Sequence, residues 1–329
     1  MRYVILGAGA VGGVIGAKLF RQGSDVVLLA RGPHLAALRD RGLTLETPQG
    51  SERLAIPACG HPSELRFGPG DVVLLATKSQ HSEAALAGLL AAAGPDVPVV
   101  CAQNGVANER LAARQFRSVY GMLVLMPATH LQPGVVQAHC APVAGALDVG
   151  CWPAGTDERG QQLVADLAAA GFSARVRSDI MRWKYAKLLS NLGNALQALC
   201  GLDGDAHAFL EAVHAEARAV LTAAGIAWAT EAELGERLQA LSPMGTIHGS
   251  ARGGGSSWQS LARGTGNIEA DFLNGEIVAL GRTYGVATPL NAALQRLAVQ
   301  TAERRRPPGA LSLADVLAAA EVADPHHTR

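Results

Sequence analysis

The chain is poor in aromatic residues and has no excess of charge of either sign. Phe, Trp and Tyr make up 4% of its 329 residues, and 28 Lys and Arg residues balance 28 Asp and Glu residues. Proteins that bind the nucleic-acid backbone usually carry a basic excess or stripe, so this balance argues against a nucleic-acid partner. The one clear basic run, at 304–306, is typical of a solvated helix end.

Cysteine is scarce, and long hydrophobic runs are missing. The five cysteines form no Cys-x-x-Cys pair, and the ten histidines lack the spacing of a zinc motif. We therefore expect reduced thiols, a cytoplasmic protein and no bound metal. No apolar run reaches the ~20 residues that a membrane-spanning helix needs, so we expect no membrane partner. Met1 leads directly into a strand pattern, which argues against a signal peptide.

Hydrophobic residues, in contrast, make up 49% of the chain, which is enough for two cores. In the first half, continuous apolar runs alternate with Ala-rich segments. We predict strands at 3–6, 25–29, 71–76 and 97–101, and helices at 11–22, 33–41, 81–93 and 107–114. This alternation predicts a doubly wound, mainly parallel sheet. We also expect a hairpin at 43–47 and 52–56, further strands within 118–150, and one near 173–177.

The second half has a helical pattern almost throughout. Long Ala-, Leu- and Glu-rich segments lie at 179–200, 206–224 and 267–284. The fold class is therefore α/β, with a sheet domain at 1–175 followed by an all-helical domain at 176–329. The glycine-rich stretch at 249–257 is either a slack loop or an active-site loop, and its composition favours neither.

A glycine motif follows the first predicted strand. The run from Gly7 to Gly12 reads Gly-Ala-Gly-Ala-Val-Gly, and Leu6 before it ends a strand while Ala10 opens a helix. In this context the motif predicts a Rossmann-type dinucleotide site, because the helix N-terminus attracts a pyrophosphate. We expect the cofactor to contact Gly7, Gly9, Ala10, Val11 and Gly12.

The end of the second predicted strand bears on which dinucleotide binds. An NAD site typically has an Asp or Glu there for the ribose 2′-hydroxyl, whereas this chain has Arg31. A guanidinium suits a 2′-phosphate, so the sequence favours NADP (NADPH) over NAD and FAD. The alternative is that Arg31 is an ordinary surface residue at a strand end.

Two polar residues follow the next two strands. Lys78 comes after the strand near 71–76, and Asn104 follows the strand near 97–101. Ligands bind at the carboxyl ends of the strands in such sheets, so both are candidates for the cofactor site. Alternatively, Lys78 is an exposed loop lysine and Asn104, which precedes Gly105, forms a turn.

A polar stripe runs along the predicted helix from Trp183 to Leu196. Lys187, Asn191 and Asn194 are spaced i, i+4 and i+7 and share one face. Since buried polar groups are costly, this face is either the polar wall of an active site or a solvent-exposed face. Glu269, at the start of another predicted helix, either orients Lys187, meets the substrate, or is an acid favoured by the helix dipole.

Taken together, these residues resemble those of the 2-dehydropantoate 2-reductase (ketopantoate reductase) family over nearly the whole chain. The resemblance is carried by the glycine run from Gly7, Lys78, Gln103 to Gly105, Trp183 to Asn194, Ser257 to Gly275, and Gly285 to Asn291. It implies an oxidoreductase that uses NADPH to reduce 2-dehydropantoate to pantoate in pantothenate and coenzyme A biosynthesis. It leaves the oligomeric state open, with a homodimer as one alternative.

The resemblance also implies roles for individual residues. It makes Lys187 the general acid, and it implies that Asn191, Ser257 and Glu269 hold the substrate or the lysine. Lys78 and Asn104 are expected beside the cofactor and the reacting centre, and Arg31 at the adenosine phosphate. Lys184, three residues earlier in the same helix, is the control for Lys187, and its replacement by Ala is expected to change turnover little.

Two positions depart from the family pattern. Asn194 follows Asn191 by three residues where four are usual, so its place in the substrate site is less defined. Gly254, three residues before Ser257, stands where a substrate-binding asparagine is expected. Two alternatives therefore stay open: a related NADP-dependent reductase of another small oxo acid, and a non-enzymatic NADP-binding sensor.

Overall fold

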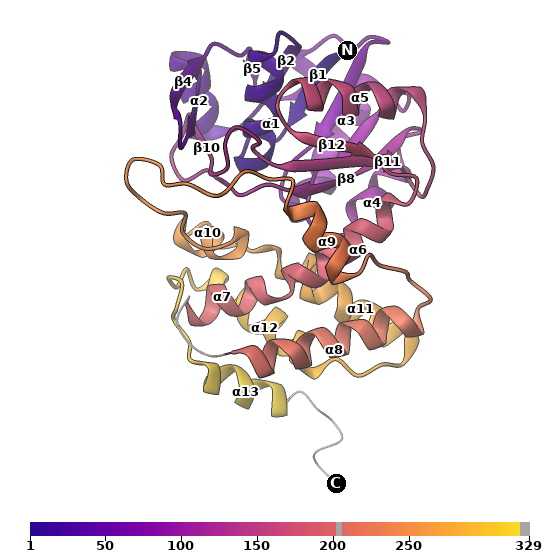
Figure 1. Cartoon of the computed structure of the whole chain (residues 1–329), viewed down its shortest axis with the longest axis vertical. Helices are drawn as coiled ribbons and strands as arrows, with labels where there is room; N and C mark the ends of the chain where they lie inside the picture. The colour runs from indigo at the N-terminus through magenta and orange to yellow at the C-terminus, as the bar shows by residue number, and fades with distance from the viewer. Residues whose placement is uncertain (202–205, 323–329) are drawn as a thin grey trace. The chain divides into compact units, whose positions relative to one another are not determined.

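A computed structural model describes residues 1–201 and 206–322 of the chain (Figure 1). Contacts divide it into two compact units. The first contains Met1–Lys184 and Ala229–Arg252, and the second contains Tyr185–Trp228 and Gly253–Arg329. The division thus falls at Lys184 rather than near residue 175, and it returns 229–252 to the first unit.

The first unit is built around an eight-stranded sheet with the strand order β12-β11-β8-β7-β6-β1-β2-β5. Its strands are β1 (Arg2–Leu6), β2 (Asp25–Leu29), β5 (Ala58–Cys59), β6 (Asp71–Leu75), β7 (Val99–Cys101), β8 (Val119–Leu125), β11 (Ala146–Cys151) and β12 (Ser173–Val176). Neighbouring strands are parallel except β8 and β11, which are antiparallel. This sheet confirms the predicted α/β class.

Helices connect these strands. They are α1 (Ala10–Arg21), α2 (Gly32–Arg41), α3 (Ser82–Ala93), α4 (Asn108–Ala113) and α5 (Glu158–Ala169), with short 3-10 turns at Pro62–Glu64 and Ser79–His81. The unit also holds α9 (Glu231–Leu238). All four predicted helices of this half are present, because their apolar faces recur at helical spacing.

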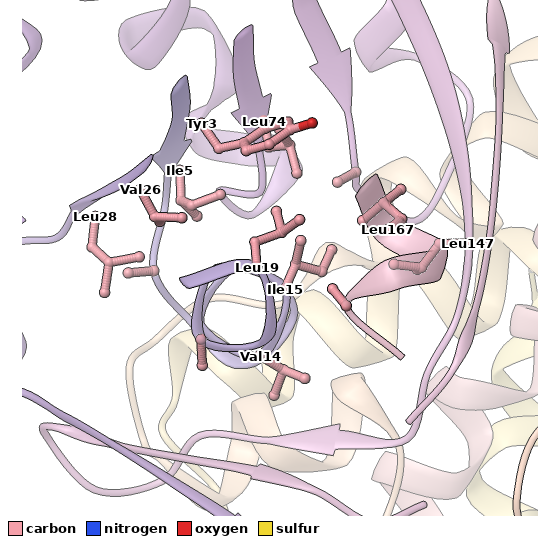
Figure 2. Packing of buried hydrophobic residues seen from close by; sticks show 14 of the residues in the cluster. Tyr3, Ile5, Val14, Ile15, Leu19, Val26, Leu28, Leu74, Leu147 and Leu167 are labelled. Atoms are coloured by element: carbon pink, nitrogen blue, oxygen red, sulfur yellow. The ribbon is translucent and has the colours of Figure 1, made fainter. Parts of the chain in front are cut away.

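The strands are apolar throughout because hydrophobic clusters cover both faces of the sheet. Tyr3 and Ile5 belong to one buried cluster, and Val4 and Leu6 belong to the other, as the period of two in a strand requires. Figure 2 shows the first cluster, in which side chains of α1 pack against strand residues. The labelled residues are Tyr3, Ile5, Val14, Ile15, Leu19, Val26, Leu28, Leu74, Leu147 and Leu167.

A second sheet differs from the prediction of a simple hairpin. β3 (Leu43–Thr47) and β4 (Gly50–Leu54) do form an antiparallel hairpin. However, β10 (Val135–Ala138) pairs in parallel with β3, and β9 (Ala128–Thr129) pairs with β10. The hairpin is therefore one half of a four-stranded sheet, whose other half comes from a distant part of the chain.

The second unit is helical in its described part. Its elements are α7 (Gly193–Cys200), α8 (His207–Ala223), α10 (Ser256–Ala262), a 3-10 helix at Glu269–Phe272, α11 (Asn274–Tyr284), α12 (Pro289–Glu303) and α13 (Leu313–Val322). Helix α6 (Ile180–Asn191) begins in the first unit and ends in the second. None of the helices within 1–201 and 206–322 is both long and apolar enough to cross a membrane.

The prediction of one continuous helix from Trp183 to Leu196 is wrong. Helix α6 ends at Asn191, and α7 begins at Gly193. At the junction, the Leu192 amide bonds to the Leu189 carbonyl three residues back, rather than four residues back as in an α-helix. Asn191 and Asn194 therefore belong to two different helices.

Candidate active site

The strand order of the large sheet reverses beside β1. From β1 the chain passes to β2 on one side, and it later returns to β6 on the other side of β1. Such a reversal opens a crevice at the carboxyl ends of the strands, where open α/β sheets bind their ligands. Here the crevice lies between the glycine loop after β1 and the segment Thr77–Lys78 after β6.

Close packing explains two of the glycines in the loop. Gly7 has a φ of +110°, and a Cβ built on it would lie 2.6 Å from the Thr77 amide nitrogen. A Cβ on Gly12 would lie 2.2 Å from the Gly7 carbonyl oxygen. Side chains at these two positions would push the loop away from the sheet or from α1.

The third glycine of the loop, Gly9, faces open space. An ideal Cβ on Gly9 meets nothing within 4 Å among the described residues. Gly9 is also the N-cap of α1, and no side chain of the described chain caps this helix. The first-turn N–H groups of α1 and its positive dipole end are therefore available to a phosphate.

A cavity of about 390 Å³ extends from this loop. It is lined by Leu6, Gly7, Ala8, Gly9, Leu29, Ala30, Arg31, His34, Gly60, His61, Pro62, Thr77, Ala84, Ala85, Gly88 and His130. The cavity thus unites the glycine loop with Arg31. Five other candidates for cofactor binding are not among the described residues that line this cavity: Ala10, Val11, Gly12, Lys78 and Asn104.

Lys78 and Asn104 lie in two loops that a buried polar network joins. The Gln103 amide donates to the Thr77 carbonyl at 2.9 Å and to the Ser82 hydroxyl at 2.7 Å. The Ser82 hydroxyl donates to Asn108, whose amide donates to the Ser79 hydroxyl. The network fixes the loop after β6 against the loop after β7, and so it constrains the backbone that carries both candidates.

Lys184, the control residue, is buried and forms an ion pair with Glu109, so its replacement would disturb the core. The two side chains are 2% and 0% exposed. Lys184 Nζ also donates to the Gln103 carbonyl at 3.0 Å. Spacing along a helix could not reveal this, because Glu109 lies in α4, far away in the sequence.

In the second unit, two candidates for substrate binding have buried polar atoms without partners. Asn191 is 4% exposed and Ser257 is 2% exposed. Neither Asn191 Nδ2 nor Ser257 Oγ has a hydrogen-bond partner among the described residues. Buried polar groups are nearly always satisfied, so each of these atoms is a candidate to bind a ligand. Lys187 precedes Asn191 by one turn of α6.

The helix break at Leu192 is stabilised by residues that the sequence did not identify as functional. Asn274 is fully buried, and its amide donates to the Leu192 carbonyl and to the Asn291 side chain, each at 3.1 Å. The Asn291 amide donates to Glu216 at 2.8 Å. Burial raises the pKa of Glu216, while hydrogen bonds from Leu290 and Asn291 oppose that shift. This chain of contacts holds the end of α6, where Asn191 lies.

The departure from the family pattern at Gly254 has a structural reason. An ideal Cβ on Gly254 would lie 2.4 Å from Trp258 Cγ, so the indole ring occupies the space of a side chain at this position. The neighbouring Gly255 amide donates to Gln197 Oε1 at 2.7 Å. A Cβ on Gly255 would lie 3.2 Å from Asn194 Oδ1, which places Asn194 beside this segment.

Glu269 begins a 3-10 turn ahead of α11 rather than an α-helix. Burial lowers the pKa of Arg263, and the charge of Glu269 opposes that shift, so the two groups interact. Arg263 is therefore one electrostatic partner of this carboxylate. The predicted role of Glu269 beside Lys187 stays a prediction.

Comparisons with known proteins cover both units. The family model described as ketopantoate reductase PanE/ApbA matches residues 3–154, and the model of its C-terminal part matches residues 179–302. A 2-dehydropantoate 2-reductase of Mesorhizobium japonicum is 31% identical over 338 residues, covering 91% of this chain and 98% of the relative. The chain belongs to the ketopantoate reductase family.

Solved structures agree with this membership. A PanE/ApbA family ketopantoate reductase from Ralstonia eutropha is 30% identical, covers 93% of this chain and 99% of its own, and has a TM-score of 0.77. A D-mandelate dehydrogenase is similar in fold, with a TM-score of 0.79, 22% identity and coverage of 93% and 99%. As in other ketopantoate reductases, we therefore expect oxidoreductase chemistry with a nicotinamide cofactor.

Proposed function

We propose that the chain reduces a small 2-oxo acid with NADPH and that 2-dehydropantoate, which would yield pantoate, is its first candidate substrate. The single observation that carries the substrate site is the pair of buried atoms without partners, Asn191 Nδ2 and Ser257 Oγ, in the unit that contains Lys187. Both can donate a hydrogen bond to a carboxylate or a keto oxygen.

The residues of the first unit fit a dinucleotide. Gly9 faces open space, the start of α1 is uncapped among the described residues, and the cavity extends to Arg31. The loop would bind the pyrophosphate, and the Arg31 guanidinium would bind a 2′-phosphate. When bound, the reduced nicotinamide supplies a hydride for C2 of the oxo acid.

Lys187 supplies the proton in this proposal. Negative charge develops on the keto oxygen as C2 gains the hydride, and a protonated lysine both stabilises that charge and donates a proton to the oxygen. Asn191 and Ser257 orient the substrate through their free donors, and Glu269 holds either the substrate or the lysine. The products are the 2-hydroxy acid and the oxidised cofactor.

A related reductase of another oxo acid is the second candidate function. The packing of Trp258 against Gly254 favours it, because an apolar ring fills the place where the family pattern has a substrate-binding amide. Such a site would prefer a 2-oxo acid with a less polar substituent than 2-dehydropantoate has.

Steady-state assays test these functions. Turnover of 2-dehydropantoate, 2-oxoisovalerate and phenylpyruvate is measured with NADPH and with NADH. We expect NADPH to be preferred, and Arg31→Ala to raise the KM for NADPH while leaving that for NADH nearly unchanged. A preference for phenylpyruvate would favour the second candidate. NADPH binding without turnover of any oxo acid would contradict both and favour a sensor.

A further inference from the structure

His34 contacts the glycine loop through one ring nitrogen and a second loop through the other. Its Nε2 lies 2.8 Å from the Ala8 carbonyl oxygen, and its Nδ1 lies 2.9 Å from the Gly134 amide nitrogen. A carbonyl only accepts and an amide N–H only donates, so Nε2 carries the proton and Nδ1 does not. Both contacts are satisfied by one species alone, the neutral imidazole with its proton on Nε2.

The surroundings of His34 favour the same neutral form. Burial lowers the pKa of His34, while the hydrogen bond to Ala8 opposes that shift. The ring centroids of His34 and His130 are 4.3 Å apart, so a second cation is close if both rings are protonated. Arg31 and His61 are the other basic groups that line the same cavity. A positive charge on His34 would therefore be unfavourable.

We propose that His34 is a positioning residue for the dinucleotide, and that it acts only while it is neutral. Ala8 lies between Gly7 and Gly9, so the bond to Nε2 holds the carbonyl of this peptide and fixes the loop that would contact the pyrophosphate. A carbonyl turned toward the phosphates would repel them. This inference rests on the proposed function, since it takes the dinucleotide as the ligand of the loop.

Protonation of His34 would break its hydrogen bond with Gly134. A proton on Nδ1 would face the Gly134 N–H, so two donors would point at each other and the ring would have to move. The Ala8 carbonyl would then lose its fixed partner. Because burial lowers the pKa of His34, the loss of cofactor affinity should begin at a pH below the ordinary His value near 6.5.

Glutamine is a suitable replacement that does not titrate. Its amide nitrogen can donate to the Ala8 carbonyl while its oxygen accepts from the Gly134 N–H, and neither changes with pH. We therefore compare wild type, His34→Gln and His34→Ala, using NADPH and NADH as separate probes and the full chain at pH 8 and pH 5.5. His248→Gln is the matched control, because His248 is exposed and bonds to Glu46 outside the cavity lining.

Dissociation constants are measured by cofactor fluorescence, and folding is checked by circular dichroism. At pH 8, we expect His34→Ala to bind both dinucleotides about five- to tenfold more weakly, the effect of one lost hydrogen bond in the binding loop. His34→Gln should bind within about threefold of wild type, a difference below that of one hydrogen bond. Between pH 8 and pH 5.5, wild type and His248→Gln should lose more affinity than His34→Gln.

The comparison also separates the ligand's own titration from that of His34. NADH lacks the 2′-phosphate, and the other basic groups of the cavity are the same in wild type and His34→Gln. If His34→Gln loses affinity at pH 5.5 as wild type does, the role of His34 is refuted while dinucleotide binding stands. If His34→Ala fails to fold, the comparison of wild type with His34→Gln at the two pH values still tests the role of His34. If wild type binds neither dinucleotide, the proposed function itself is wrong.

Discussion

Replacing Lys184 should destabilise the protein strongly, although the residue lies one turn from the proposed general acid. The Lys184 and Glu109 side chains are 2% and 0% exposed, and Lys184 is the only ion-pair partner of Glu109 among the described residues. Lys184→Met would leave a buried carboxylate without a cation. Breaking a buried pair in this way costs about 3–5 kcal/mol of the free energy of unfolding.

A double variant separates the cost of the unpaired Glu109 carboxylate from the cost of lost packing. Glu109→Leu together with Lys184→Met removes both charges and keeps side-chain volume in the core. Replacement of a whole buried pair by apolar residues is often neutral. However, the Gln103 carbonyl also loses its bond to Lys184 Nζ, and an unsatisfied buried group costs ~1–3 kcal/mol. The double variant should thus be more stable than Lys184→Met by about 2 kcal/mol, within the range of coupling between contacting residues.

Urea denaturation of both variants, followed by circular dichroism, measures these differences. Loss of less than about 1 kcal/mol in Lys184→Met would refute the reasoning, since that is the range of a solvent-exposed ion pair. A double variant no more stable than Lys184→Met would also refute it, because the cost would then come from packing rather than from the unpaired carboxylate.

Four further variants test the loop, the carboxylate and a buried lysine. Gly9→Val should keep its fold, because its side chain enters open space, but it should lose dinucleotide binding. Gly7→Val should be destabilised, because its side chain would collide with Thr77. Equal melting temperatures of the two variants would contradict this prediction. Glu269→Gln should cut turnover more than tenfold without changing the melting temperature, whereas a helix-dipole role would cost ~0.3–1 kcal/mol and spare turnover. Burial lowers the pKa of Lys18 from 10.5 to about 8. Between these two pH values the unfolded chain binds more protons than the folded chain does. The free energy of unfolding therefore rises with pH over this range, by about 3 kcal/mol at most. Lys18→Met should lack this rise in denaturation curves at pH 8 and 10.

Local patterns allowed the sheet and the glycine loop to be predicted from the sequence. Apolar runs, helical spacing and the glycines of the loop all act within a few residues of each other. The four-stranded sheet was only half predicted, because β10 pairs with β3 from a distant part of the chain. Such pairing depends on tertiary packing, which periodicity does not encode.

The same reason explains which site residues were missed. His34 contacts Ala8 and Gly134, which are 26 and 100 positions away. The break at Leu192 was not predicted because leucine fits a helix, and its carbonyl bonds to Asn274, 82 positions away. The buried ion pair of Lys184 was not predicted, because its partner Glu109 lies in another helix.

The role of Lys187 as general acid is the central claim, and a pH–rate profile of Lys187→Ala tests it most directly. We expect a loss in turnover of about 10²-fold or more, the usual size for general acid catalysis, together with loss of the alkaline limb. NADPH affinity should persist, and Ser190→Ala, an exposed change on the same helix, should behave as wild type. Turnover of Lys187→Ala close to that of Ser190→Ala, with the alkaline limb intact, would contradict the account and make Lys78 the next candidate.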